Sequence, residues 1–316
     1  MKLTTPILFI FFNNPNTTRL VFDRIKDAQP TKLFLFCDGI RKGNESSDGI
    51  TKELKREIYD KVNWHCEVFT FFPDINYGPA QGVYKAINWF FDNVEEGIIL
   101  EHDTLPHPDF FLYCATLLEK YRHEKKIGLI SGSCFYDFNS SLDSSYGFNY
   151  FPHIWGWATW KRAIIDYTSS PKATDSEIRQ LIKNRILISK NLKFYVRYMF
   201  FLNRRNLIET WDLQLMFALW SNSMCSIFPT KNLISNIGFG PDALHCTDPN
   251  HSLSNIPVQS ILPLRHPTSI KFDNNYDLLY YQRHINKSPF RLLLSIVRHY
   301  IMYFKKKQFL KSIFYL

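Results

Sequence analysis

Glycine is scarce in this chain, and cysteine is never clustered. Only 12 of the 316 residues are glycine, and neither GxGxxG nor GxxxxGK[ST] occurs. Their absence excludes the glycine-rich phosphate loops of dinucleotide-binding domains and P-loop enzymes. The six cysteines contain no CxxC pair. A zinc finger is therefore excluded, and the cysteines are typical of buried thiols in a reducing compartment.

Long apolar runs are also missing. No window reaches the ~20 apolar residues that a membrane-spanning helix needs. The N-terminal stretch MKLTTPILFIFFNNPN has a short apolar run that Asn-Asn-Pro interrupts, which is typical of a first strand and not of a signal peptide. We therefore expect a cytoplasmic protein.

Acidic residues are absent from the C-terminal stretch, residues 278–316, which carries eight Lys and Arg. Without these eight, 30 basic residues face 29 acidic ones, so the net charge of +9 belongs to the tail. A charge confined to one end predicts a local anionic partner and not a nucleic-acid-binding domain. We expect the basic amphipathic tail to attach peripherally to an anionic membrane, at the cytoplasmic face of the inner membrane. A tail helix that packs on the domain with its lysines in water is the open alternative.

Apolar segments of strand length alternate with amphipathic segments in the first 101 residues. The expected strands span residues 6–12, 32–37, 66–72 and 98–101, and the expected helices span about 17–27, 51–61 and 81–93. This alternation predicts an α/β fold with a mostly parallel, doubly wound sheet flanked by helices. The turns that follow the four strands should therefore lie on one rim of the sheet.

Beyond this series, the sequence predicts a helix at 109–123, a strand at 127–131 and a loop region at 131–149. A basic helical insert is expected at 176–206, followed by a helix that starts near Thr210 and a strand near 225–228. The insert is either a solvated charged face or a surface that faces a membrane or an acceptor. We expect a domain of residues 1–250, with a nucleotide-sugar half (1–131) and an acceptor half (132–250), and an extension of residues 251–316.

The stretch GIILEHDTLPHPDFF, residues 97–111, contains the most informative strand end. Its apolar run stops at Glu101, His102 and Asp103, and the two prolines that follow prevent the strand from continuing. Ligands of open α/β sheets bind at the carboxyl ends of the strands, where carboxylates can hold a divalent cation and a phosphorylated ligand. An acidic, solvated strand end is the alternative.

Two further segments have both a structural and a functional interpretation. FPHIWGWATW, residues 151–160, places three tryptophans within six residues, as core packing or as a wall that stacks on a sugar ring. Asp212 follows Thr210 and Trp211 in the first turn of an expected helix, where the helix dipole alone favours an acid. The two glycines and the proline of LISNIGFGPDALH predict a mobile loop that closes on a ligand.

The chain resembles the nucleotide-diphospho-sugar glycosyltransferases of the GT-A fold, of the bacterial kind related to N-acetylglucosaminyltransferase I. The resemblance covers residues 6–245 and rests on motifs in a consistent order: PILFIFFNNPNTTRL, LFLFCDGIR, NYGPAQGVYKAINWFF, ILEHDTLPHPDFFLY, FPHIWGWATW, ETWDLQL and LISNIGFGPDALH. The resemblance implies a GT-A, Rossmann-like domain that binds a nucleotide-sugar.

The same resemblance implies roles for single residues. Asp103 would bind the metal, Mn²⁺ or Mg²⁺, that bridges the donor diphosphate, and Asp212 would be the general base. Related transferases often have Asp at the position of His102, so the sugar specificity is open. The other residues that the resemblance or the rim places at the donor are Asn13, Asn14, Asp38, Gly78, Lys85, Glu101, Gly238, Phe239 and Gly240. His245 would contact the metal or a phosphate. The expected sugar wall consists of Trp155, Trp157 and Trp211.

These features together predict a metal-dependent, inverting glycosyltransferase with a UDP-sugar donor. Its acceptor is expected to be a saccharide or lipid-linked saccharide of lipopolysaccharide or capsule assembly. A sugar-phosphate nucleotidyltransferase is one alternative, although FFNNPNTTR lacks the glycine-rich basic loop that such an enzyme needs after its first strand. A non-catalytic sugar- or membrane-binding protein on the same fold is the other.

Overall fold

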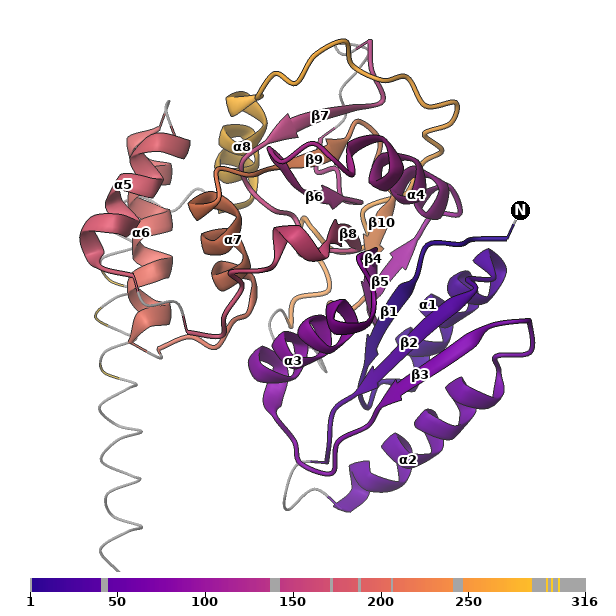
Figure 1. Cartoon of the computed structure of the whole chain (residues 1–316). Coiled ribbons are helices and arrows are strands. Elements are labelled where there is room, and N and C mark those ends of the chain that lie inside the picture. The colour runs from indigo at the N-terminus through magenta and orange to yellow at the C-terminus, as the bar shows by residue number, and fades with distance from the viewer. Residues whose placement is uncertain are drawn as a thin grey trace, which may run out of the picture.

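The computed structural model (Figure 1) describes residues 2–40, 45–136, 143–170, 173–186, 189–205, 207–240 and 247–285, with residues 294, 297 and 301. His245 and nearly all of the basic tail lie outside the described residues. Among the helices of the described residues, none is both long enough and apolar enough to cross a membrane.

The first 101 residues form the predicted alternating series. Their elements are β1 (Ile7–Phe11), α1 (Pro15–Ala28), β2 (Lys32–Cys37), α2 (Glu45–Asp60), β3 (Glu67–Phe71), α3 (Gly78–Asn93) and β4 (Glu96–Glu101). The four strands pair in parallel in the order β3-β2-β1-β4. The prediction of a shared rim is confirmed, because the carboxyl ends of parallel strands lie at the same edge.

The remaining chain completes the sheet with mixed pairings. Its strands and helices are β5 (Thr104–Pro106), α4 (Asp109–Tyr121), β6 (Ile127–Ser131), β7 (Tyr146–Asn149), β8 (Trp157–Trp160), α5 (Asp175–Arg185), α6 (Lys190–Arg204), α7 (Asp212–Ser221), β9 (Cys225–Pro229), β10 (Ile234–Asn236) and α8 (Asn274–Tyr280). The order of the eight-stranded sheet is β3-β2-β1-β4-β8-β6-β9-β7, and β10 pairs separately with β5. The α/β class with a mostly parallel sheet is thus confirmed.

The structure corrects one prediction in this second half and adds detail in two other segments. The expected loop of residues 131–149 ends in β7, which pairs antiparallel with β9. The tryptophan segment contains β8, which runs antiparallel between β4 and β6. All four residues of β8 are buried, so the alternation that marks a half-exposed strand is missing. The basic insert is helical, as predicted, and consists of two helices, α5 and α6.

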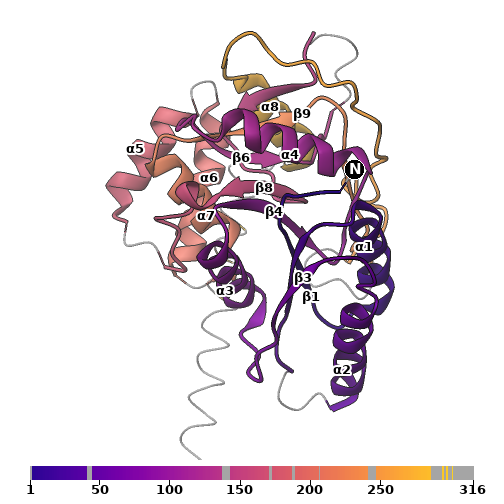
Figure 2. The ribbon, with the colours of Figure 1, turned by 45° about the vertical axis from the view of Figure 1, so that its right-hand side comes forward.

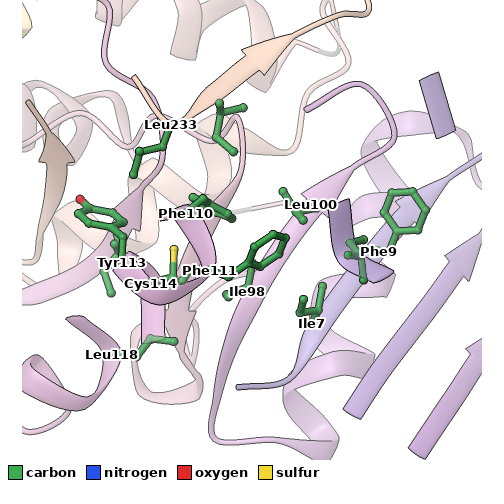
Figure 3. Close-up of a cluster of buried hydrophobic side chains, with 14 of the residues drawn as sticks. Ile7, Phe9, Ile98, Leu100, Phe110, Phe111, Tyr113, Cys114, Leu118 and Leu233 are labelled. Atoms are coloured by element: carbon green, nitrogen blue, oxygen red, sulfur yellow. The ribbon is translucent and has the colours of Figure 1, made fainter. Parts of the chain in front are cut away.

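Helices cover both faces of the sheet, as Figures 1 and 2 show. Successive side chains of a strand point to opposite faces, and β1 therefore divides its residues between two cores. Ile7 and Phe9 join the core that α1 and α4 cover (Figure 3). Leu8 joins the second core, which α3 and α5 to α7 cover. This two-sided burial explains why the strands are almost wholly apolar.

Candidate functional site

A tight turn follows β4 and fixes the position of its acidic residues. Glu101 is the last residue of β4 and lies beside Ile10 of β1. The Thr104 hydroxyl accepts a hydrogen bond from the Glu101 amide (3.0 Å) and donates one to the Glu101 carbonyl (2.8 Å). Thr104 is 1% exposed. The backbone of the acidic turn is therefore held from inside the fold, and the side chains of His102 and Asp103 remain partly exposed.

The loop after β10 lies directly on this turn. Strand β10 pairs antiparallel with β5, opposite Thr104 and its neighbours, and the Ile237 amide donates to the Asp103 carbonyl at 2.8 Å. A side chain at Gly238 would collide with Asp103, because a Cβ there would lie 2.3 Å from Asp103 Oδ2. The sequence predicted separately the acidic turn and the SNIGFG loop, and the structure brings them together.

Helix α7 carries a third carboxylate to the same place. Burial and the negative charges of Asp103 and Asp212 together raise the pKa of the Glu101 carboxyl well above its usual range. The Leu213 amide (2.9 Å) and the Thr210 hydroxyl both donate to Asp212 Oδ1. The helix begins close to Thr210, as expected, with Trp211 at the N-cap position. Thr210 orients the Asp212 carboxylate.

The donor set of this cluster suits a hard divalent cation whose coordination a ligand completes. Carboxylate oxygens are the side-chain ligands that Mg²⁺ and Mn²⁺ prefer. Within the described ranges, no group of three His, Cys, Asp or Glu side chains could hold a metal ion on its own. Mg²⁺ typically binds one or two carboxylates together with substrate phosphates and water. Asp103, with Glu101 and Asp212 nearby, fits that mode of binding.

Three tyrosines from separate elements lie in the electric field of Asp212. Burial first, and then the Asp212 charge among other contributions, raises the pKa values of Tyr167, Tyr195 and Tyr280, the last to about 12. The Tyr167 hydroxyl donates to the Trp211 carbonyl at 3.2 Å. These tyrosines were not predicted, because one follows η1 (Lys161–Ala163), one lies in α6 and one in α8.

Asp38, at the end of β2, fixes another turn of the rim. Its carboxylate accepts hydrogen bonds from the amides of Gly39 (2.8 Å), Tyr77 (3.0 Å) and Gly78 (2.9 Å). Gly78 has a φ of +76°, which favours glycine at this position. Burial raises the pKa of Asp38, although the three amides and the charge of Lys55 act in the opposite direction. Lys55 of α2 was not predicted, and no local motif marks it.

Three other predicted donor residues lie in α3 and in the turn after β1. Lys85 Nζ lies 4.6 Å from the centre of the Tyr77 ring. Asn13 is exposed in the turn after β1. The Asn14 side chain accepts from the Thr17 amide at 3.4 Å and caps α1. Asn14 therefore has a structural role in the turn besides any contact with a ligand.

The predicted tryptophan wall is largely inside the fold. Trp157 is 1% exposed and Trp211 is 9% exposed, and their rings stack with centroids 6.0 Å apart. The Trp157 ring is thus a core side chain and does not present a surface to a sugar. Trp155 is partly exposed and lies 5.9 Å from the ring of Phe239. Of the three tryptophans, Trp155 therefore fits the predicted wall best, at the loop that covers Asp103.

Comparison with known proteins found no matching family model and no matching curated protein. Among solved structures, the chain is similar to 4-diphosphocytidyl-2C-methyl-D-erythritol synthase from Anaerococcus prevotii DSM 20548, with a TM-score of 0.32 and 10% identity over 51% of this chain and 73% of that one.

Two further structures show the same level of similarity. A cytidylyltransferase from Leptospira borgpetersenii serovar Hardjo-bovis matches with a TM-score of 0.31 and 11% identity over 55% of this chain and 66% of that one. HddC from Yersinia pseudotuberculosis matches with a TM-score of 0.32 and 12% identity over 52% of this chain and 80% of that one. Similarities at this level carry no argument about the activity of this chain.

Proposed function

We propose that the protein is a metal-dependent, inverting glycosyltransferase that uses a nucleoside-diphosphate sugar. The observation that carries the proposal is the gathering of three carboxylates at the end of β4, where burial first, and then the charges of Asp103 and Asp212, raise the pKa of Glu101. Neighbouring carboxylates in a buried site are costly unless a cation or a proton compensates their charge. A divalent cation that also binds a diphosphate would supply this compensation.

The donor side of the proposed site consists of the acidic turn and the loop over it. Asp103 would bind the cation, Mn²⁺ or Mg²⁺, which when bound neutralises the charge of the leaving diphosphate. Glu101 and His102 would contact the ribose and the sugar. The segment 238–240 would cover the donor, and its position on Asp103 supports this role.

Asp212 is the proposed general base. Its orientation by Thr210 and by the Leu213 amide supports a carboxylate held for one task. In the proposed step, an acceptor oxygen forms a bond to the anomeric carbon while the bond to the diphosphate oxygen breaks. Asp212 takes the proton of the acceptor hydroxyl. Attack from the face opposite to the diphosphate inverts the anomeric configuration.

The turn at Asp38 is the proposed nucleoside site. An ionised carboxylate has about four acceptor positions, and three backbone amides use three of those on Asp38. The remaining position could accept the imide N–H of uracil, which favours a UDP-sugar donor. Asn13, Gly78 and Lys85 lie in or beside this turn region and would contact the nucleotide.

The cellular setting is part of the proposal. The acceptor would be a saccharide or lipid-linked saccharide of cell-surface polysaccharide assembly. The protein would work in the cytoplasm, and its basic tail would hold it at the anionic inner membrane. The composition of the tail supports this setting, with eight cations and no acid in residues 278–316.

The turn after β1 weighs against a sugar-phosphate nucleotidyltransferase. In this turn the Asn14 side chain caps α1 and Pro15 is the first helical residue. The segment FNNPNTTR contains no glycine, so the turn lacks the flexible, amide-rich loop that would surround a triphosphate.

One experiment separates the three candidates. The full chain is incubated with UDP-, GDP-, dTDP- and CMP-sugars and Mn²⁺ or Mg²⁺, and release of the nucleotide is measured. In parallel, nucleoside triphosphates and sugar 1-phosphates are supplied, and release of pyrophosphate is measured. We expect nucleoside diphosphate release from one nucleotide-sugar, lost in Asp103→Ala. Pyrophosphate release alone would identify a nucleotidyltransferase, and neither product would identify a non-catalytic protein.

A further inference from the structure

Helix α6 exposes a face on which cations and phenylalanines are interspersed. At about 100° per residue, five side chains of α6 and that of Arg205, the residue after the helix, fall within an arc of roughly 100°. We call this set the α6 outer face: Lys190, Phe194, Arg197, Phe201, Arg204 and Arg205. Its four cations are exposed, Phe194 is 37% exposed and Phe201 is partly exposed.

The opposite side of α6 supplies its packing. Leu192, Val196 and Phe200 are 2%, 1% and 5% exposed and belong to the core that α7 shares. The Phe200 ring lies 6.2 Å from the Phe217 ring of α7. In Figure 1, α5 and α6 form the outer layer, and α7 lies between them and the sheet. The α6 outer face is thus the side of this helix that its packing onto α7 does not use.

The neighbouring helix shows that the α6 outer face is unusual within this insert. Helix α5 exposes acids and bases together, among them Asp175, Glu177, Arg179 and Lys183, as an ordinary solvated helix does. Residues 190–205 contain five Lys and Arg and no Asp or Glu. At the far end of α6, Arg204 forms an ion pair with Asp175, and no other ion pair of α6 occurs within the described residues.

We propose that the α6 outer face docks on an anionic phospholipid surface. Its cations match anionic headgroups in charge, and phenylalanines between cations can enter the headgroup and acyl boundary. The Arg205 guanidinium lies 3.8 Å from the centre of the Phe201 ring, so charge and apolar surface are presented together. In the tail, Leu294, Val297 and Ile301 are about half exposed (53%, 50% and 51%) and offer further apolar side chains.

The docking would also place the carboxylate cluster close to the membrane. The role of the cluster in this step rests on the proposed function. Packed helices lie about 8–10 Å apart, axis to axis. Asp212 is the first residue of α7, so it would lie about one helix layer behind the docked surface. A lipid-linked acceptor could then reach the proposed base while its lipid stays in the membrane.

Vesicle co-sedimentation of the full chain tests the docking without any turnover. We expect binding to phosphatidylcholine vesicles that contain phosphatidylglycerol, weak binding to pure phosphatidylcholine, and a loss of binding as salt rises. Each cation near an anionic surface contributes roughly fivefold to partitioning. Phe194→Ser/Arg197→Glu, which replaces one cation by an anion and removes one apolar contact, should therefore bind anionic vesicles at least about tenfold more weakly.

A matched control is available on α1, which lies on the opposite side of the molecule from α6 (Figure 1). Leu20 is 52% exposed and Arg24 is exposed four residues later. Leu20→Ser/Arg24→Glu therefore also replaces an exposed apolar side chain and reverses one charge, and it should bind as the wild type does. If Phe194→Ser/Arg197→Glu unfolds, Lys190→Glu/Arg197→Glu keeps the phenylalanines and serves in its place.

Three outcomes would overturn the proposal. They are absence of vesicle binding by the wild type, undiminished binding by the folded α6 variants, and binding to single-stranded RNA without partitioning into vesicles. Nucleotide-sugar binding is measured separately on the same variants and should be unchanged. A failure of the docking and a failure of the proposed glycosyl transfer are therefore distinguishable.

Discussion

Two strand ends on the same rim carry acids, but they use them differently. Asp38 follows β2 and accepts hydrogen bonds from three backbone amides. Glu101 ends β4 and faces the charges of Asp103 and Asp212. The fold itself satisfies the first carboxylate, whereas the second lies among like charges that a cation would relieve. The difference indicates that the end of β2 positions a turn and that the end of β4 is the reactive centre.

We expect the largest effect at the carboxylate cluster near the end of β4. Asp212→Asn keeps the shape of the side chain but removes the proposed base, so kcat should fall roughly 10²- to 10⁴-fold. The affinity for the donor should change little. Steady-state kinetics with the donor found in the panel measure both quantities. Unchanged turnover in Asp212→Asn, with turnover abolished in Asp103→Ala, would mean that the base lies elsewhere.

A methyl group at Gly238 should disturb the acidic turn that contains Asp103. The new Cβ would lie 2.3 Å from Asp103 Oδ2, so either the carboxylate or the loop must move. Overpacking of this kind costs about 1–3 kcal/mol, which predicts donor binding weaker by roughly 5- to 150-fold in Gly238→Ala. Gly49→Ala is a suitable control, because a Cβ there meets nothing within 4 Å. Equal donor affinity in both variants would show that the loop contact is irrelevant to the donor.

Asp38→Asn should mainly affect stability. The Asn side chain has only one acceptor oxygen for the three amides, and each buried donor left unsatisfied costs about 1–3 kcal/mol. We expect a lower free energy of unfolding in urea, a higher KM for the donor and a nearly unchanged kcat. A fall in kcat as large as that of Asp212→Asn would remove the distinction between the two strand ends.

A smaller effect concerns Asp277 of α8, which accepts from Asn149 Nδ2 (2.7 Å) and from the Tyr150 amide (3.1 Å). Burial raises its pKa to about 7. The folded state therefore keeps a proton that the unfolded state loses above about pH 4. The stability from this group is complete below pH 4 and is lost as the pH rises toward 7.

Asp277→Asn should remove this contribution, which is at most about 1.4 kcal/mol per pH unit. Urea unfolding between pH 4 and 7 would then show a flatter loss of stability with rising pH than in the wild type. If the free energy of unfolding changed with pH in the same way in both proteins, the raised pKa of Asp277 would be refuted.

The sequence predicted the first half of the fold well, for a physical reason. Parallel strands buried on both faces are continuous apolar runs, and the helices between them are amphipathic, so β1 to β4 were located to within a few residues. The acidic turn could be placed on the rim because the rim follows from the strand order. The same reasoning failed for β7 and β8, whose antiparallel partners are distant in the chain.

The chemical surroundings of the site could be predicted only in part. Asp103 and Gly238 belong to recognisable segments, and their contact follows from the pairing of β10 with β5. Tyr167, Tyr195 and Tyr280 lie within the electrostatic influence of Asp212 but come from three segments that no local pattern connects. The burial of Trp157 could not be predicted either, because a tryptophan in a core and one in a sugar site look the same in the sequence.

The most direct test of the central claim is calorimetric titration of nucleotide-sugars into the wild type, Asp103→Asn and Asp38→Asn, each with Mn²⁺ and with EDTA. We predict that a UDP-sugar binds the wild type only with Mn²⁺ and that Asp103→Asn loses this metal-dependent binding. Asp38→Asn should keep the metal dependence at reduced affinity. Metal-dependent binding that survives intact in Asp103→Asn, or no binding of any nucleotide-sugar to the wild type, would contradict the account.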